Sequence, residues 1–199
     1  MATNLHTQLT SFISPFLVSK FSKSYDESEA LLKRSIETSI STILIGLDNK
    51  SEEHSLYDEL LEYISKSEFY SDIDFGATKS ITVNNSFNKE GHQPLNLIFS
   101  NKKERISEMI SNEVGIKSET ASAILNFSVM LIFSYLKKQD QNIKSLQALL
   151  SEQRRIMLNC VPEGIRILLG VSTFEVIEDE TQSGFASSIY NFFLGHFQF

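Results

Sequence analysis

The 199-residue sequence predicts an all-α fold, a multihelical bundle of about seven to nine helices with a long central loop. Apolar residues recur at helical spacing through most of the chain, as in helices that bury one face. The 8 glycines and 3 prolines fall mostly between these periodic segments, where helices are expected to begin and end. In addition, one helical pattern occurs twice, 89 positions apart, which is the pattern of two related helical halves.

The repeated pattern is a short amphipathic segment, a turn and a long apolar segment, over residues 17–47 and again over 106–136. Gly115 is placed to end the earlier helix of the second unit in a left-handed cap. At the matching turn of the first unit, Asp26 with Glu29 predicts a capping box. The apolar matches barely exceed those expected from composition. A true internal duplication and a chance similarity between two helical patterns therefore both stay open.

Four helices are expected before the central loop. Apolar spacing predicts a helix near residues 5–13, and Pro15 can start the next one because proline is tolerated at the first helical position. Residues 27–47 carry a broad apolar stripe and predict a long third helix. Residues 48–51 are expected to form a turn whose last residue, Ser51, caps a fourth helix.

Periodicity fails over about residues 65–94, which predicts a long loop that is either functional or poorly ordered. Helical spacing then resumes through about residue 159. Pro162 interrupts it, and a short last helix is expected to end at Gly170. Residues 120–136 are uncharged but carry several polar side chains and are shorter than a membrane span. We therefore expect a buried core helix there.

The chain divides into a helical domain over residues 1–170 and an acidic linker with an aromatic tail over 171–199. On a helix, several tail aromatics would form one stripe, which either packs on its own bundle or docks a protein partner or neighbouring subunit. Membrane binding is disfavoured because the tail has no lysine or arginine. The candidate partner-binding residues are Phe185, Ile189, Phe192, Phe193, Phe197 and Phe199.

Composition favours a soluble cytoplasmic protein. The net charge of −7 disfavours nucleic-acid binding, since neutralising phosphates requires a basic surface. The single cysteine, Cys160, rules out an internal disulfide and suits a reducing compartment; its apolar neighbours predict a small buried core residue. No secretory signal is recognised at the N-terminus.

No motif predicts catalysis or a cofactor. The sequence lacks a glycine-rich phosphate loop, paired metal-ligand spacings and a nucleophile motif, and its four histidines are scattered. The basic clusters 102–105 and 154–155 are expected to be solvated helix faces. We therefore predict a non-enzymatic structural or interaction module that binds a protein partner or itself. The alternative is a small-ligand binder or enzyme whose site lies between helices or under the central loop.

Residues 149–170 end in VPEGIRILLG, which resembles the closing motif of the YidB-like bacterial domain of unknown function (the domain-of-unknown-function 937 family). Residues 35–47 and 122–136 resemble that family's two long apolar helices, and Gly115–Ser118 resembles its helix turn. The resemblance covers about residues 5–170 and implies an all-helical bacterial domain. It departs in the central loop, which is glycine-rich in the family. It implies no activity, cofactor or functional residue.

Overall fold

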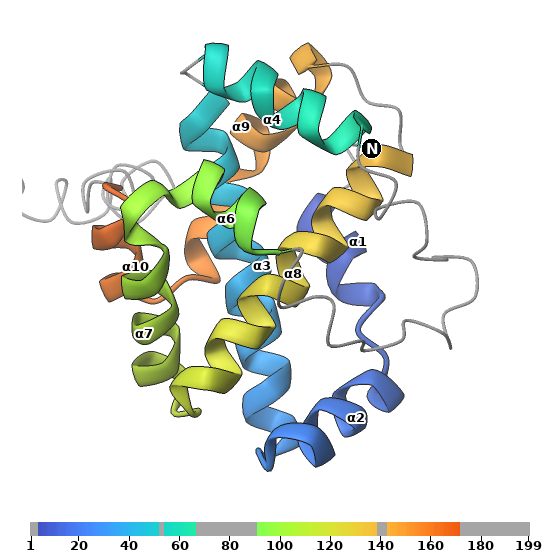
Figure 1. Ribbon diagram of the computed structural model, residues 1–199, viewed down its shortest axis with the longest axis vertical. Helices are drawn as coiled ribbons and strands as arrows, with labels where there is room; N and C mark the ends of the chain where they lie inside the picture. The colour runs from blue at the N-terminus through green and yellow to red at the C-terminus, as the bar shows by residue number, and fades with distance from the viewer. Residues whose placement is uncertain (1–3, 52–53, 67–90, 139–142, 172–199) are drawn as a thin grey trace, which may run out of the picture.

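The computed structural model describes residues 4–51, 54–66, 91–138 and 143–171 (Figure 1). Within these ranges the protein is all-α, which confirms the predicted fold class: the described part holds nine α-helices and one 3-10 turn. The bounds before the central segment are α1 (Leu5–Ser11), α2 (Pro15–Tyr25), α3 (Glu29–Ser51) and α4 (His54–Lys66). Those after it are α6 (His92–Phe99), the 3-10 turn η2 (Ser100–Lys102), α7 (Lys103–Val114), α8 (Ser118–Lys138), α9 (Ile143–Asn159) and α10 (Glu163–Leu168).

Helices α3 and α8 pack against each other at the centre of the bundle, and the other helices surround them (Figure 1). Both are buried on almost all sides, so they lack the one-sided stripe of a surface helix. The expectation of a buried helix over residues 120–136 is therefore confirmed within the bundle. By length and composition α8 could also cross a membrane, but 89% of its most apolar window is buried inside the protein.

The predicted repeat is visible in the structure. Helices α1–α4 and α6–α9 follow in the same order, and α3 and α4 begin 89 residues before α8 and α9. The turns between the second and third helices share their hydrogen bonds: Ser22 Oγ donates to the Glu27 carbonyl at 2.8 Å, and Ser111 Oγ to the Ile116 carbonyl at 2.6 Å. Such agreement at a fixed offset favours two related halves over a chance similarity.

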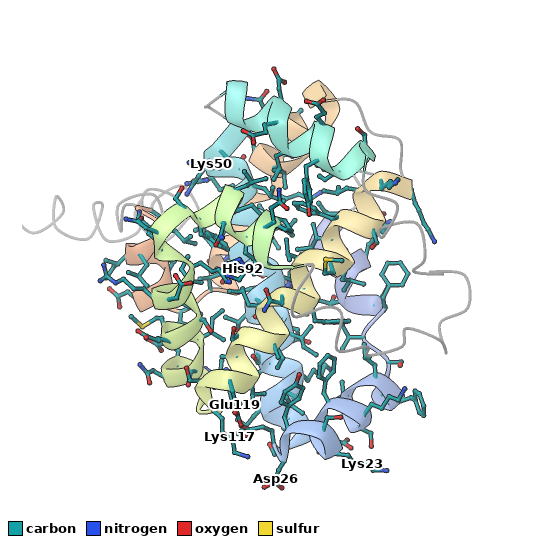
Figure 2. All side chains as sticks on the ribbon, in the orientation of Figure 1. Lys23, Asp26, Lys50, His92, Lys117 and Glu119 are labelled. Atoms are coloured by element: carbon teal, nitrogen blue, oxygen red, sulfur yellow. The ribbon has the colours of Figure 1, made fainter. Side chains whose placement is uncertain are left out.

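The two repeat turns lie against each other at one end of the molecule (Figure 2). Lys117 Nζ donates to the carbonyl oxygens of Tyr25 and Asp26 at 2.9 and 3.2 Å. The Glu27 carboxylate accepts from the Lys117 backbone N–H at 2.7 Å. The equivalent turns of the two halves are thus joined by direct hydrogen bonds.

The capping box predicted at Asp26 and Glu29 is wrong. Asp26 has a left-handed conformation, with φ of 53°, and ends α2, as Gly115 with φ of 85° ends α7. Ser28 provides the cap instead, since its Oγ accepts from the Leu31 N–H at 3.2 Å. An aspartate tolerates the left-handed region better than most residues, which explains why this turn needs no glycine.

Candidate functional site

A cleft of about 330 Å³ lies at the C-terminal end of α3; we refer to it as the α3 cleft. Its walls come from three distant parts of the chain: the end of α3, the junction between α6 and α7, and the residue that follows α10. The lining residues are Gly46, Asn49, Lys50, the segment 98–102 and Leu169. Ser100, Asn101 and Lys102 are exposed, so this wall opens to solvent. Figure 2 shows Lys50 far from the repeat turns marked by Asp26 and Lys117.

Helix α3 reaches the cleft because a buried carboxylate holds its last turn. Arg154 Nη1 lies 2.6 Å from Asp48 Oδ2, Ser151 Oγ donates to Asp48 Oδ1 at 3.2 Å, and Asp48 is only 6% exposed. Ser51 Oγ donates back to the Asp48 carbonyl at 2.6 Å. The turn predicted over residues 48–51, with Ser51 as a cap for α4, is therefore wrong. Four polar residues suggested a turn, but long-range partners make this segment helical.

Arg154 also corrects the expectation that 154–155 is only a solvated helix face. It is half-buried and reaches from α9 to α3, where its Nη1 also donates to Asn49 Oδ1 at 2.9 Å. Asn49 Nδ2 then donates to the Leu169 carbonyl at 3.1 Å. One arginine thereby fixes the amide that lines the cleft, and that amide holds the chain after α10.

The opposite wall has a second contact with the end of α10. Lys102 Nζ donates to the Leu168 carbonyl at 3.1 Å. The adjacent Lys103 is buried, contrary to the expectation that 102–105 is solvated throughout, and this burial lowers the pKa of its ammonium although Glu104 opposes the shift. Two neighbouring lysines therefore differ: Lys102 lines the cleft and Lys103 packs into the bundle.

Ser100, at the rim of the cleft, has an unusual backbone. Its φ of 53° and ψ of −128° lie in a region that side-chain-bearing residues rarely adopt. Such conformations cost about 1–3 kcal/mol and cluster at ligand sites and switches. Here the conformation turns the chain sharply from α6 into η2. It therefore presents the three consecutive polar residues of η2 along one wall.

Gly46 allows α6 to pack tightly against the end of α3. A Cβ on Gly46 would lie 2.5 Å from Phe99 Cε1 and 2.6 Å from Ile98 Cγ2, so glycine permits the close approach of α6. At the 89-residue offset, Gly46 corresponds to Tyr135 of α8. That side chain is buried, its ring centroid lies 5.9 Å from that of Phe12, and its hydroxyl donates to Gln8 Oε1. The matching position of the other half therefore carries a buried aromatic side chain, whereas at Gly46 the side chains of α6 pack directly on the helix.

The residues of the exposed wall also differ in polarity between the two halves. Phe12 and Ile13 occupy the positions that Asn101 and Lys102 hold in the second unit. Both apolar residues pack against the core, whereas both polar ones are exposed and line the cleft. The α3 cleft is therefore a specific departure from the repeat, in which polar donors replace apolar side chains.

The predicted partner-binding residues cannot be compared with this site. Phe185, Ile189, Phe192, Phe193, Phe197 and Phe199 lie outside the described residues, as does most of the central loop. The structure does provide a cleft between helices, the location given by the alternative hypothesis. Sequence reasoning missed its residues because two asparagines, two lysines and a glycine carry no motif.

Cys160 was expected to be buried and is exposed. It lies in the turn between α9 and α10, where its N–H donates to the Met157 carbonyl at 3.1 Å. The flanking Leu158 and Val161 are buried, as their apolar character predicts. Apolar neighbours failed as a guide because a turn can direct one residue outward between two that point inward.

These features define an all-helical protein of two related halves, with a polar cleft at one of the two equivalent positions. The chain belongs to the family of bacterial proteins of unknown function DUF937, which matches residues 7–139. This agrees with the resemblance noted from the sequence. The match includes both helix–turn–helix units, whereas the motif at 161–170 lies beyond it. No curated protein and no solved structure matches the chain.

Proposed function

We propose that this protein is a cytoplasmic, non-enzymatic binding module and that the α3 cleft is its ligand site. The observation that carries the proposal is the polar wall formed by Asn101 and Lys102 where the other half has the apolar Phe12 and Ile13. A bundle that needed only stability would gain from apolar side chains that pack on the core at both positions. A cleft that opens to solvent and is lined with polar groups favours binding.

The groups around the cleft favour binding over catalysis. General acid–base catalysis needs titratable groups whose environments separate their pKa values. The lining side chains offer hydrogen-bond donors instead, from Asn49, Lys50, Asn101 and Lys102. Lys102 and Asn49 already donate to the carbonyls of Leu168 and Leu169 at the end of α10. These contacts hold the wall in shape, and Asn101 presents a further amide donor on its exposed side.

Blocking the cleft tests the proposal. Asn101→Trp places a large side chain on the exposed wall, and Asn112→Trp introduces the same side chain at an exposed site on α7 that does not line the cleft. Full-length wild type and both variants would be screened against a mixture of small metabolites by ligand-observed NMR. We expect ligands that bind wild type and Asn112→Trp to lose binding to Asn101→Trp. Equal binding by all three proteins would refute the α3 cleft as the site.

A second candidate function is docking of a protein partner or neighbouring subunit through the C-terminal segment. Ile167, on the last described helix, is 62% exposed, and the chain enters residues 172–199 shortly after it. An exposed apolar side chain on α10 is available to a partner. It favours an interaction site that includes α10.

A further inference from the structure

We infer that the segment directly after α10, residues 172–180, binds in the α3 cleft of its own chain and competes there with the ligand; this inference rests on the proposed function. The segment itself lies outside the described residues, and the described part shows where it starts. Leu169 lines the cleft, and the last described residue, Val171, follows two positions later. The chain therefore leaves the bundle at the edge of the cleft.

The start of this segment is held in place by the wall of the cleft. The carbonyl oxygens of Leu168 and Leu169 accept from Lys102 and Asn49, at 3.1 Å in each case. The side chain of Val171 is buried, so the anchored part extends to this residue. The next three residues of an extended chain span at most about 10 Å. The segment can therefore enter the cleft without a long connecting loop.

The apolar residues of the segment match part of the lining. Phe174, Val176 and Ile177 provide apolar side chains, and Ile98 and Phe99 provide apolar lining. The cleft volume of about 330 Å³ is in the range of pockets that bury small ligands. One or two of these three side chains could therefore enter it.

The charges of the segment also suit this site. Residues 172–199 contain no lysine or arginine, whereas residues 172–180 carry four carboxylates, at Glu175, Glu178, Asp179 and Glu180. The described lining residues include no carboxylate that would repel them. The ammonium group of Lys102 lies at the end of α10, where this acidic segment begins, and opposite charges attract at short range.

The covalent connection favours this segment over the same segment of a second copy. A short flexible linker gives an effective concentration of about 1 mM. At roughly 10 μM protein, the connected segment is therefore favoured about 100-fold. A ligand must displace it, so the apparent affinity of the cleft falls in proportion to the fraction of molecules in which the cleft is empty.

Disulfide trapping in the full-length protein tests the inference. The single cysteine, which is exposed, is first removed by Cys160→Ser. Val176→Cys is then paired with Asn101→Cys in the cleft or with Asn112→Cys, a matched exposed site on α7 outside it. A free segment would reach both sites, because α10 packs against α7 beside Glu113 (Figure 1). We expect oxidised glutathione to link residues 101 and 176 within one chain at least about tenfold faster than 112 and 176, since a disulfide needs Cα atoms about 4.4–6.8 Å apart.

The linked protein is then screened with the metabolite mixture by ligand-observed NMR, before and after reduction. We expect ligands of the α3 cleft to bind only after reduction, and equal binding in both states would overturn the inference. Equal linking rates for the two cysteine pairs, or links between chains only, would also overturn it. Ligands that lose binding to Asn101→Trp would then still support the proposed function. A fast link between residues 101 and 176 in a protein that binds no ligand would support docking of the segment and count against the proposed function.

Discussion

Replacement of Arg154 by alanine should cost much of the stability of the bundle, because it leaves a buried carboxylate without its charged partner. Asp48 is 6% exposed, and its remaining hydrogen-bond partner on a side chain would be Ser151 at 3.2 Å. The same arginine also holds Asn49 at 2.9 Å, so the variant loosens the last turn of α3 as well. The perturbation therefore acts on the element that forms one wall of the cleft.

The magnitude follows from the burial of the two partners. Removing one member of a fully buried ion pair costs about 3–5 kcal/mol. Arg154 is 26% exposed, so water already screens part of the pair, and Ser151 continues to donate to the carboxylate. We therefore expect Arg154→Ala to lower the free energy of unfolding by about 2–3 kcal/mol. Lys33→Ala provides the control: its partner Glu37 lies 4.0 Å away on an exposed face, and its effect should stay within about 0.5 kcal/mol.

The assay is urea unfolding followed by far-ultraviolet circular dichroism, with Asp48→Asn and the double variant completing a double-mutant cycle. A coupling energy between residues 48 and 154 of about 1–3 kcal/mol is expected for groups in direct contact. Asp48→Asn keeps the side-chain size and removes the charge, so it separates the electrostatic loss from a packing loss. A coupling energy near zero, or an Arg154→Ala variant as stable as Lys33→Ala, would refute the assignment of this pair as the support of the α3 end.

Three further predictions concern other parts of the molecule. Gly46→Ala places a methyl group 2.5 Å from Phe99 and should lower the free energy of unfolding by about 1–3 kcal/mol in the same urea assay. Burial lowers the pKa of His6 although Glu37 opposes the shift, so the unfolded chain binds more protons below pH 6.5 and stability should fall as the pH drops below that value. His6→Gln should therefore show a smaller fall in Tm between pH 7.5 and about 5.5 than wild type does. Deletion of residues 184–199 should abolish partner binding or self-association, measured by pull-down and light scattering, while circular dichroism shows an intact bundle.

Local signals in the sequence predicted the fold class and most helices. Helical spacing indicated α2, α7 and α8, and the glycines at 115 and 170 end helices with φ of 85° and 75°. These features depend on residues close together in the chain. Local propensity and periodicity therefore suffice to predict them.

The ends of α3 could not be predicted in the same way. Four consecutive polar residues, 48–51, favour a turn until Arg154 is known to lie beside Asp48, and these two residues are 106 positions apart. At the other end, Ser28 rather than Asp26 caps the helix because Asp26 itself takes the left-handed conformation that ends α2. Tertiary partners and turn conformation overrode the local preference at both ends.

The cleft was beyond sequence reasoning for a different reason: its walls come from three distant parts of the chain. Gly46 carries no motif, and its role emerges only when Ile98 and Phe99 of α6 are seen to pack directly on it. The polar wall likewise has meaning only beside Leu169, which arrives from the far end of the described chain. The spacing of residues in the sequence predicts which face of a helix is buried. It does not predict where helices that are distant in the chain leave a cleft between them.

A comparison of the two halves indicates which part of the molecule is the best candidate for a specific function: the part in which the halves differ. Helix α9 packs against α3 and α4 against α8, so each half covers part of the other and both are needed for one core. Contacts that occur in both halves stabilise this common core, and a substitution in them would destabilise both halves. The end of α3 differs from the end of α8 in its wall residues and in its contacts with the carbonyls of Leu168 and Leu169. Two differences at one place favour a specific role for this polar site, because the core shared by the two halves would be served equally well by apolar wall residues at both ends.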